Sequence, residues 1–168
     1  HRIWGDPSVK WWGTPNLDLT ASEVQLTDIL TRHHELPIGH GWWAICQRED
    51  AEVVGDVFLR PKSDDPDIIE LGYHLVKAAW GNGYATEAAR AILTYGLTML
   101  GLERVSAYVH VDNHRSMSVI RRLGLVDSGL TQHGGYPHHR FEATSLHSAE
   151  DEDTVSALEE PWPKSELA

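Results

Sequence analysis

The fold of this chain is decided by the stretch Leu75-Val76-Lys77-Ala78-Ala79-Trp80-Gly81-Asn82-Gly83-Tyr84-Ala85-Thr86-Glu87-Ala88. An extended apolar run ends where the stretch begins, two glycines follow, and apolar residues then recur with the period of a helix. Gly81 and Gly83 let the backbone approach a ligand because neither residue carries a Cβ atom. The first amides of the helix have no intrahelical partner, so the turn predicts an anion-binding site.

Upstream of this turn the pattern predicts three strands. They cover Trp42–Gln47, Glu52–Arg60 and Ile68–Val76. The short links between them favour antiparallel neighbours. Glycine and proline interrupt the region before the strands, and a single helix is expected there, capped by Thr20 or Ser22.

Downstream of the turn the apolar period changes from two residues to about 3.6, which predicts a helix over Tyr84–Leu100. A strand over Val105–Val111 follows, and then a helix that ends at Leu123. Two closing strands are expected over Leu125–Ser128 and Arg140–Thr144. The order β-β-β-α-β-α-β-β is typical of an α/β (α+β) domain, in which helices pack on a mixed sheet.

Length and charge limit what the chain can be. Its 168 residues suffice for one domain, which we place over residues 1–145. The formal net charge is −11, and residues 146–168 form an acidic segment that is expected to be flexible. So negative a chain is a poor binder of nucleic acid, and no apolar run is long enough to cross a membrane. The single cysteine, Cys46, fits the reducing cytoplasm.

Glycine turns of this general kind bind three classes of anionic ligand. A nucleoside triphosphate is excluded because the Gly-Lys-Ser/Thr of a Walker-type loop is absent. A dinucleotide would require a turn directly after the first strand and a small residue in place of Thr86; Glu103 mimics its ribose-binding acid, but at the start of a strand. The third ligand is the diphosphate of coenzyme A. A turn that merely begins a helix is the alternative to all three.

The surrounding motifs resemble the GNAT superfamily of acetyltransferases, and within it the RimJ/RimL-like group. That group's signature ELGY-x-L … WGKGYATEA is similar to Glu70–Leu75 followed by Trp80–Ala88. Its segment N-x-x-S-x-x-V-L-E-K-L-G-F resembles Asn113–Leu125, and its DPEV segment resembles Asp6–Val9. Its IG-x-I strand resembles Val54–Val57, so the likeness extends over about residues 5–145.

The resemblance implies a GNAT fold, a mixed and mostly antiparallel sheet whose two central strands splay apart in a V with helices beside it. Acetyl-CoA would be the co-substrate in that gap, and no metal would take part. The family's first strand and helix are expected to be missing, because the chain starts five residues before the DPEV-like segment. The cofactor-binding residues that the resemblance implies are Leu75, Val76, Trp80, Gly81, Asn82, Gly83, Tyr84, Ala85, Thr86, Asn113 and Ser116.

The implied reaction is direct transfer, in which a neutral primary amine attacks the thioester carbon. A backbone amide near Leu75 and Val76 is expected to hold the oxyanion. Glu70 is the first candidate for the base, because superfamily members often have a glutamate on this strand. His74, on the same strand face, is the second candidate and His110 the third. An ordinary salt-bridged glutamate is the alternative role for Glu70.

For the acid, many superfamily members use a tyrosine in the helix after the asparagine motif, and Ile120 occupies that position here. The RimJ/RimL-like pattern instead implies Ser116, whose hydroxyl would reach the departing sulfur. The alternative is a helix-start serine that bonds to its own backbone. Asn113 is expected to cap this helix and to contact the pantetheine amides, and capping alone is the simpler alternative.

The acceptor would be an amine, either a protein N-terminus or a small molecule, with no nucleic acid or membrane partner. The early tryptophans either line an acceptor pocket or pack in the core: Trp4, Trp11, Trp12, Trp42 and Trp43. Tyr136-Pro137 is expected in a loop that closes over the acceptor, or in a plain turn. Adjacent histidines such as His138-His139 point to opposite strand faces, so no metal site is expected.

Two further possibilities stay open at this point. An uncovered sheet edge would favour association, so a homodimer is compatible with the sequence. A GNAT-like module that binds acyl-CoA with little or no turnover is the main alternative to an enzyme, and a dinucleotide-binding protein is the weaker one.

Overall fold

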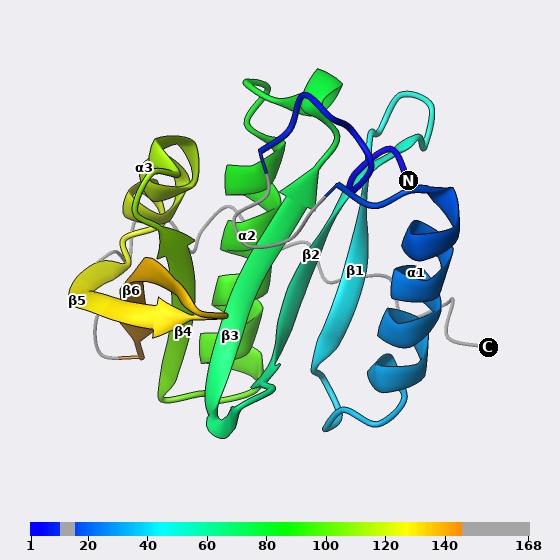
Figure 1. Cartoon of the computed structure of the whole chain (residues 1–168). Coiled ribbons are helices and arrows are strands. Elements are labelled where there is room, and N and C mark those ends of the chain that lie inside the picture. The colour runs from blue at the N-terminus through cyan, green and yellow to red at the C-terminus, as the bar shows by residue number, and fades with distance from the viewer. Residues whose placement is uncertain (11–15, 146–168) are drawn as a thin grey trace.

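The computed structural model describes residues 1–10 and 16–145, which form one six-stranded sheet with helices beside it (Figure 1). The strands are β1 (Gly41–Cys46), β2 (Val53–Lys62), β3 (Asp65–Leu75), β4 (Arg104–His110), β5 (Val126–His133) and β6 (Tyr136–Thr144). They follow the order β1-β2-β3-β4-β6-β5, and only β3 and β4 are parallel. The expected mixed, mostly antiparallel sheet is confirmed. The acidic segment 146–168, Trp11 and Trp12 lie outside the described residues.

Three α-helices of the described residues lie around the sheet. They are α1 (Leu19–His33), α2 (Tyr84–Thr94) and α3 (His114–Arg122). In Figure 1, α2 lies behind the middle of the sheet, α3 beside β4, and α1 next to β1. No helix in the described ranges is long and apolar enough to span a membrane.

The first helix differs from the expectation at its start. Asp18, not Thr20 or Ser22, is the N-cap: its carboxylate accepts a hydrogen bond from the Ala21 amide at 2.8 Å. A carboxylate satisfies a free first-turn amide and favours the positive helix end. Ser22 is the buried residue of this helix, whereas the apolar side chains Val24, Leu26 and Leu30 are exposed.

The two faces of the sheet differ in chemistry because side chains alternate along each strand. The helix face packs on α2 and α3 and carries the core, which includes Val57, Leu59, Leu71, Val105, Ala107, Val109 and Phe141. The opposite face is called the polar face below, and it carries Asp56, Arg60, Glu70, His74, Ser106, Tyr108, His110 and His138. Candidate chemistry therefore lies opposite the core.

The middle of the sheet opens as the V-shaped family fold requires. Within the described residues β3 and β4 pair only at Glu70 and Ser106. The β2–β3 pairing, by contrast, extends from Gly55 to Lys62 along β2, and β4 pairs with β6 along its whole length. Backbone groups of β3 beyond Glu70 therefore have no ladder partners on the β4 side among the described residues.

The closing hairpin is longer than the sequence pattern predicts. Tyr136-Pro137 belongs to β6, so the expected loop at these residues is wrong. Gly134 and Gly135 both have positive φ, 57° and 81°, which suits a two-residue hairpin turn and lets the strands continue to His133 and Tyr136.

The long central helix is also not uniform. It is α-helical to Thr94 and then forms one π-helical turn over Tyr95–Met99, marked by a hydrogen bond from the Leu100 amide to the Tyr95 carbonyl. The expected helix over Tyr84–Leu100 is therefore present but widens in its last turn.

Candidate functional site

The glycine turn before α2 has the open amides that an anion site requires. Gly81 and Gly83 have φ values of 83° and 86°, a left-handed backbone that glycine adopts without strain. A Cβ added at either residue would meet nothing within 4 Å. Gly83 is the N-cap of α2, and no side chain bonds to this helix start. The amides of the first turn are therefore free for a ligand.

Trp80 closes one side of this turn. Its indole Nε1 donates to the Leu75 carbonyl at 3.2 Å, which ties the turn to the end of β3. The Arg115 guanidinium of α3 lies over the Trp80 ring, 4.8 Å from its centroid. Since a cation–π contact leaves the guanidinium donors unused, Arg115 adds positive charge beside the open amides. The sequence pattern did not single out Arg115, because only the packing of α3 places it here.

One expected donor is already engaged. The Val76 amide donates to the Val54 carbonyl at 2.9 Å, on the β2 side of the strand. An oxyanion would have to compete with that bond, so Val76 is a poor choice as a free oxyanion donor. The Leu75 carbonyl likewise has a partner in Trp80.

Glu70 is the buried carboxylate of the polar face, with 5% of its surface exposed. Its Oε2 lies 3.1 Å from the Arg60 guanidinium, and its Oε1 lies 3.8 Å from His133 Nε2. Burial raises the pKa of Glu70, and the positive charge of Arg60 opposes this rise. Among the described residues Glu70 Oε2 and Arg60 Nε have no aligned hydrogen-bond partner. The pair thus keeps unused polar atoms in a buried place.

His74 lies on the same face of β3, as its spacing from Glu70 predicts. Its Nδ1 lies 3.0 Å from Asp56 Oδ2, on the neighbouring strand, so a carboxylate orients the ring. Trp4 and Phe58 flank it, with ring centroids at 6.2 and 5.9 Å. Trp4 therefore reaches the polar face, and this position is compatible with either a packing role or an acceptor-lining role.

His110 is engaged in local structure. Its Nδ1 accepts a hydrogen bond from the Asp112 amide at 3.1 Å, and the residue is buried. His138 lies beside it, and His133 beside His138, with ring centroids 5.3 and 5.2 Å apart. These three histidines come from three strands, so sequence spacing alone does not reveal the cluster. No group of His, Cys, Asp and Glu suited to a metal ion occurs in residues 1–10 and 16–145.

Ser116 lies one turn inside α3, on the other side of the sheet. Its Oγ is 2.7 Å from the Tyr73 hydroxyl of β3. Its amide donates to Asn113 Oδ1 at 3.2 Å, so Asn113 caps the helix as expected. Burial raises the pKa of Tyr73 to about 12, although the hydrogen bond with Ser116 opposes this. Tyr73 belongs to the quoted motif, but only the tertiary structure brings it to Ser116.

The candidate base and the candidate acid thus lie on opposite faces of the sheet. Glu70 projects from β3 on the polar face, whereas Tyr73 and Ser116 meet on the helix face. The ladder between β3 and β4 is limited to Glu70 and Ser106, at the middle of the sheet. A reactive group held next to this short ladder would have a carboxylate on one side and a hydroxyl on the other.

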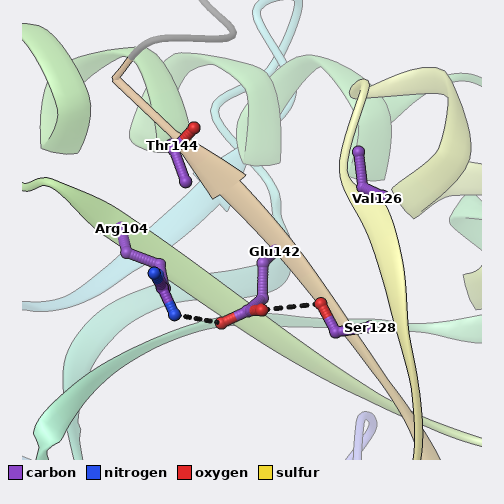
Figure 2. Close-up of a pocket in the computed structure, with 5 residues that line it drawn as sticks. All are labelled: Arg104, Val126, Ser128, Glu142 and Thr144. Atoms are coloured by element: carbon purple, nitrogen blue, oxygen red, sulfur yellow. Dashed lines mark hydrogen bonds and ion pairs between the residues drawn. The ribbon is translucent and has the colours of Figure 1, made fainter.

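A shallow cavity of about 220 Å³ lies at the far strands, between Arg104 of β4 and Val126 of β5 (Figure 2). Its carboxylate, Glu142, accepts from Ser128 Oγ at 2.6 Å and pairs with Arg104 at 3.3 Å. Arg140 also donates to Glu142, at 2.6 Å. Because both carboxylate oxygens have partners, this cavity offers no free acid or base.

Comparison with known proteins assigns the class: the chain is an acetyltransferase. Residues 1–126 match the family described as the acetyltransferase (GNAT) domain, and the chain belongs to this family. It is 30% identical over 133 residues to the uncharacterized N-acetyltransferase p20 of Bacillus licheniformis, covering 77% of this chain and 72% of p20. It is 23% identical to the uncharacterized N-acetyltransferase YoaA of Bacillus subtilis, covering 85% and 80%.

Solved structures share the fold. A GNAT-family acetyltransferase from Bacillus anthracis superposes with a TM-score of 0.70 at 18% identity, covering 86% of each chain. A ribosomal-protein-S5-alanine acetyltransferase from Vibrio fischeri superposes with a TM-score of 0.57 at 19% identity, covering 73% of this chain and 68% of that one. The expected GNAT resemblance is confirmed by the family match. Members of the family generally use acetyl-CoA.

Proposed function

We propose that this chain transfers the acetyl group of acetyl-CoA to a primary amine by direct attack. The observation that carries the proposal is the uncapped start of α2, where two left-handed glycines leave open space in front of free amides. A diphosphate fits such a site because it accepts several backbone hydrogen bonds at the positive end of a helix. When bound, the co-substrate supplies the activated acetyl group.

The residues that would hold the co-substrate follow the two elements beside the gap. The diphosphate would rest on Gly81, Asn82, Gly83, Tyr84, Ala85 and Thr86, with Trp80 and Arg115 at the side. The pantetheine arm would lie along Leu75 and Val76 and reach Asn113 and Ser116. Free amides and a cation–π-bound guanidinium together favour an anion here.

Glu70 would accept the proton that the acceptor ammonium must lose. A carboxyl group of raised pKa holds such a proton better than an ordinary one, and burial has this effect on Glu70. The unused polar atoms of Glu70 and Arg60 favour a substrate or water at this place. His74, oriented by Asp56, is the second candidate for the base, and His110 is the third.

Ser116 would donate its hydroxyl hydrogen to the departing sulfur. The alternative of a serine that bonds only to its own backbone does not fit its contact with Tyr73. The acceptor would be a protein N-terminus or a small amine approaching from the polar face. The name of the Vibrio fischeri protein favours a protein acceptor, whereas the acidity of this chain suits any cationic amine.

A second candidate function is an acyl-CoA-binding domain with little turnover. Two observations favour it: the Val76 amide is engaged with Val54, and Glu70 forms an ion pair with Arg60. Both features would weaken catalysis without weakening the anion site. We place either activity in the cytoplasm, where the exposed Cys46 stays reduced.

Thermal unfolding is measured with acetyl-CoA, with coenzyme A and with NAD. An assay of thiol release with a panel of amines then completes the test of the proposal. A ligand at a hundred times its Kd stabilises the folded state by about 2.7 kcal/mol, a measurable shift. Stabilisation by acetyl-CoA with release of free thiol supports the enzyme. Stabilisation without release for every amine supports the binding domain, and stabilisation by NAD alone would refute both.

A further inference from the structure

Ser116 differs from five other hydroxyl residues of the described helices in where its side chain bonds. Those residues donate to the carbonyl one turn back, at 2.8 or 2.9 Å, as seen for Ser22, Thr27, Thr31, Thr98 and Ser118. Ser118, only two residues after Ser116, donates in this way to the His114 carbonyl. Ser116 instead meets Tyr73 Oη at 2.7 Å. Its hydroxyl is therefore free of the backbone.

The direction of this bond follows from the chemistry of its partners. A phenol is a stronger donor than an aliphatic alcohol, and a buried donor without a partner costs free energy. Tyr73 stays protonated near neutral pH because its pKa is raised to about 12. We therefore assign Tyr73 as the donor and Ser116 Oγ as the acceptor. The hydrogen of Ser116 is then free to turn to a different acceptor.

We propose that Tyr73 is a positioning residue for acetyl transfer: its phenol occupies a lone pair of Ser116 and turns the serine hydrogen toward the departing sulfur. This inference rests on the proposed function. Ile120 stands where the superfamily resemblance implies a tyrosine on the helix, and Tyr73 would provide a functional counterpart of that phenol on β3. The two differ in role, because Tyr73 acts through Ser116.

The bonds and protons of the step balance without an external acid. The nitrogen–carbon bond forms, the carbon–sulfur bond breaks, and its electron pair stays on sulfur. Ser116 passes its hydroxyl proton to this sulfur and regains one proton from water, and Tyr73 keeps its own proton. The nitrogen releases one proton to water as the amide forms, so the nitrogen loses one proton, the sulfur gains one, and Ser116 is unchanged.

A double-mutant cycle tests whether Tyr73 acts through Ser116. Tyr73→Phe retains the ring in the core, and Ser116→Ala removes the hydroxyl. Each single change is expected to lower kcat about tenfold, the effect of one lost hydrogen bond, with KM for acetyl-CoA unchanged. The double variant is expected to have the same kcat as Ser116→Ala, because Tyr73 and Ser116 act as one hydrogen-bonded unit that either change disables. Losses that multiply would overturn the inference, since they would mean that Tyr73 acts independently of Ser116.

Matched variants guard against a general structural effect. Ser118→Ala removes a helix hydroxyl that bonds to the backbone, and Tyr95→Phe removes a phenol on the π-helical turn, next to Trp43. Both are expected to leave kcat unchanged. Ser116→Thr retains the hydroxyl and is expected to recover most of the activity lost in Ser116→Ala. Failure of this recovery, with a fold as stable as the parent, would overturn the role of the hydroxyl.

A measurement without turnover separates this inference from the proposed function. The ultraviolet absorbance of the thiolate reports the pKa of the thiol in bound coenzyme A. That pKa is expected to rise in Tyr73→Phe and Ser116→Ala and to stay constant in Tyr95→Phe and Ser118→Ala. Coenzyme A that binds with the same thiol pKa in all variants would overturn the inference and leave the proposed function standing. Absence of any binding would overturn both.

Discussion

The Arg60 guanidinium lies 3.1 Å from the Glu70 carboxylate, directly across the β2–β3 pairing. The guanidinium also lies over the rings of Phe58 and Trp42, 4.9 and 5.4 Å from their centroids. These contacts hold the cation in place, so its charge acts steadily on the carboxylate. Burial raises the pKa of Glu70, and the charge of Arg60 opposes this rise. The balance between the two effects sets the pH range in which Glu70 can accept a proton.

Replacing Arg60 by methionine should move the acid limb of the kcat/KM profile to higher pH. The pKa of Glu70 is already raised above its ordinary 4.5, so a base at this position loses activity as pH falls through the raised value. Without the guanidinium the charged carboxylate is less stable, and the pKa rises further. Rates measured over roughly pH 5 to 9 would reveal the shift.

Two further variants complete this test. Glu70→Gln should lower kcat/KM by about 10²–10⁴, the factor that general base catalysis contributes, and should abolish the acid limb. Arg32→Met removes an exposed ion pair with Asp28 on α1 and should change nothing. A profile of Arg60→Met that coincides with the parent profile would show that Glu70 is not the titrating base.

Alanine at Gly83 should weaken the binding of acetyl-CoA more than it weakens the fold. The new Cβ meets no protein atom within 4 Å, so it would project into the space proposed for the diphosphate. The left-handed backbone costs alanine about 1–2 kcal/mol of stability in addition. We expect the Kd for coenzyme A, measured by calorimetry, to rise at least tenfold.

Gly124→Ala is the matched control for this backbone cost. Gly124 has a φ of 83°, the same open surroundings, and a place at the end of α3. It should lose a similar amount of stability and keep the Kd of the parent. If Gly83→Ala and the parent have equal Kd values for coenzyme A, the anion site does not lie at the glycine turn.

The order of elements was predictable because each depends on local signals. The switch of the apolar period at Tyr84 and the glycines of the turn are properties of a short segment, and the structure confirms the helix that they predict. The register between strands is not local. The meetings of Glu70 with Arg60, and of Tyr73 with Ser116, depend on which residues lie opposite one another after folding. The pair Gly134-Gly135 is a local signal of a two-residue hairpin turn, and such a turn leaves Tyr136 in the strand instead of a loop.

Asn113 should show two separable effects. Its Oδ1 accepts from the Ser116 amide at 3.2 Å, so Asn113→Ala should lower the free energy of unfolding by about 1 kcal/mol. Asn113→Ser retains a capping oxygen and should unfold like the parent. If the asparagine also contacts pantetheine, both variants should raise the KM for acetyl-CoA. A parental KM in Asn113→Ser would assign the residue to capping alone.

The histidine cluster of the polar face should make stability depend on pH. Burial lowers the pKa of His133 and of His138 below 6.5. The positive charges of His138 and Lys62 add to this effect at His133, whereas the bond with the Tyr136 carbonyl opposes it at His138. Because the unfolded chain then binds more protons than the folded one, this stability is present above pH 6.5 and lost as pH falls through the lowered values.

In His138→Asn the fall in melting temperature on acidification should be smaller, since one such group is gone. His34→Asn, an exposed position after α1, serves as the control and should retain the parental pH dependence. If His138→Asn and His34→Asn show the same slope as the parent, the cluster does not control acid stability.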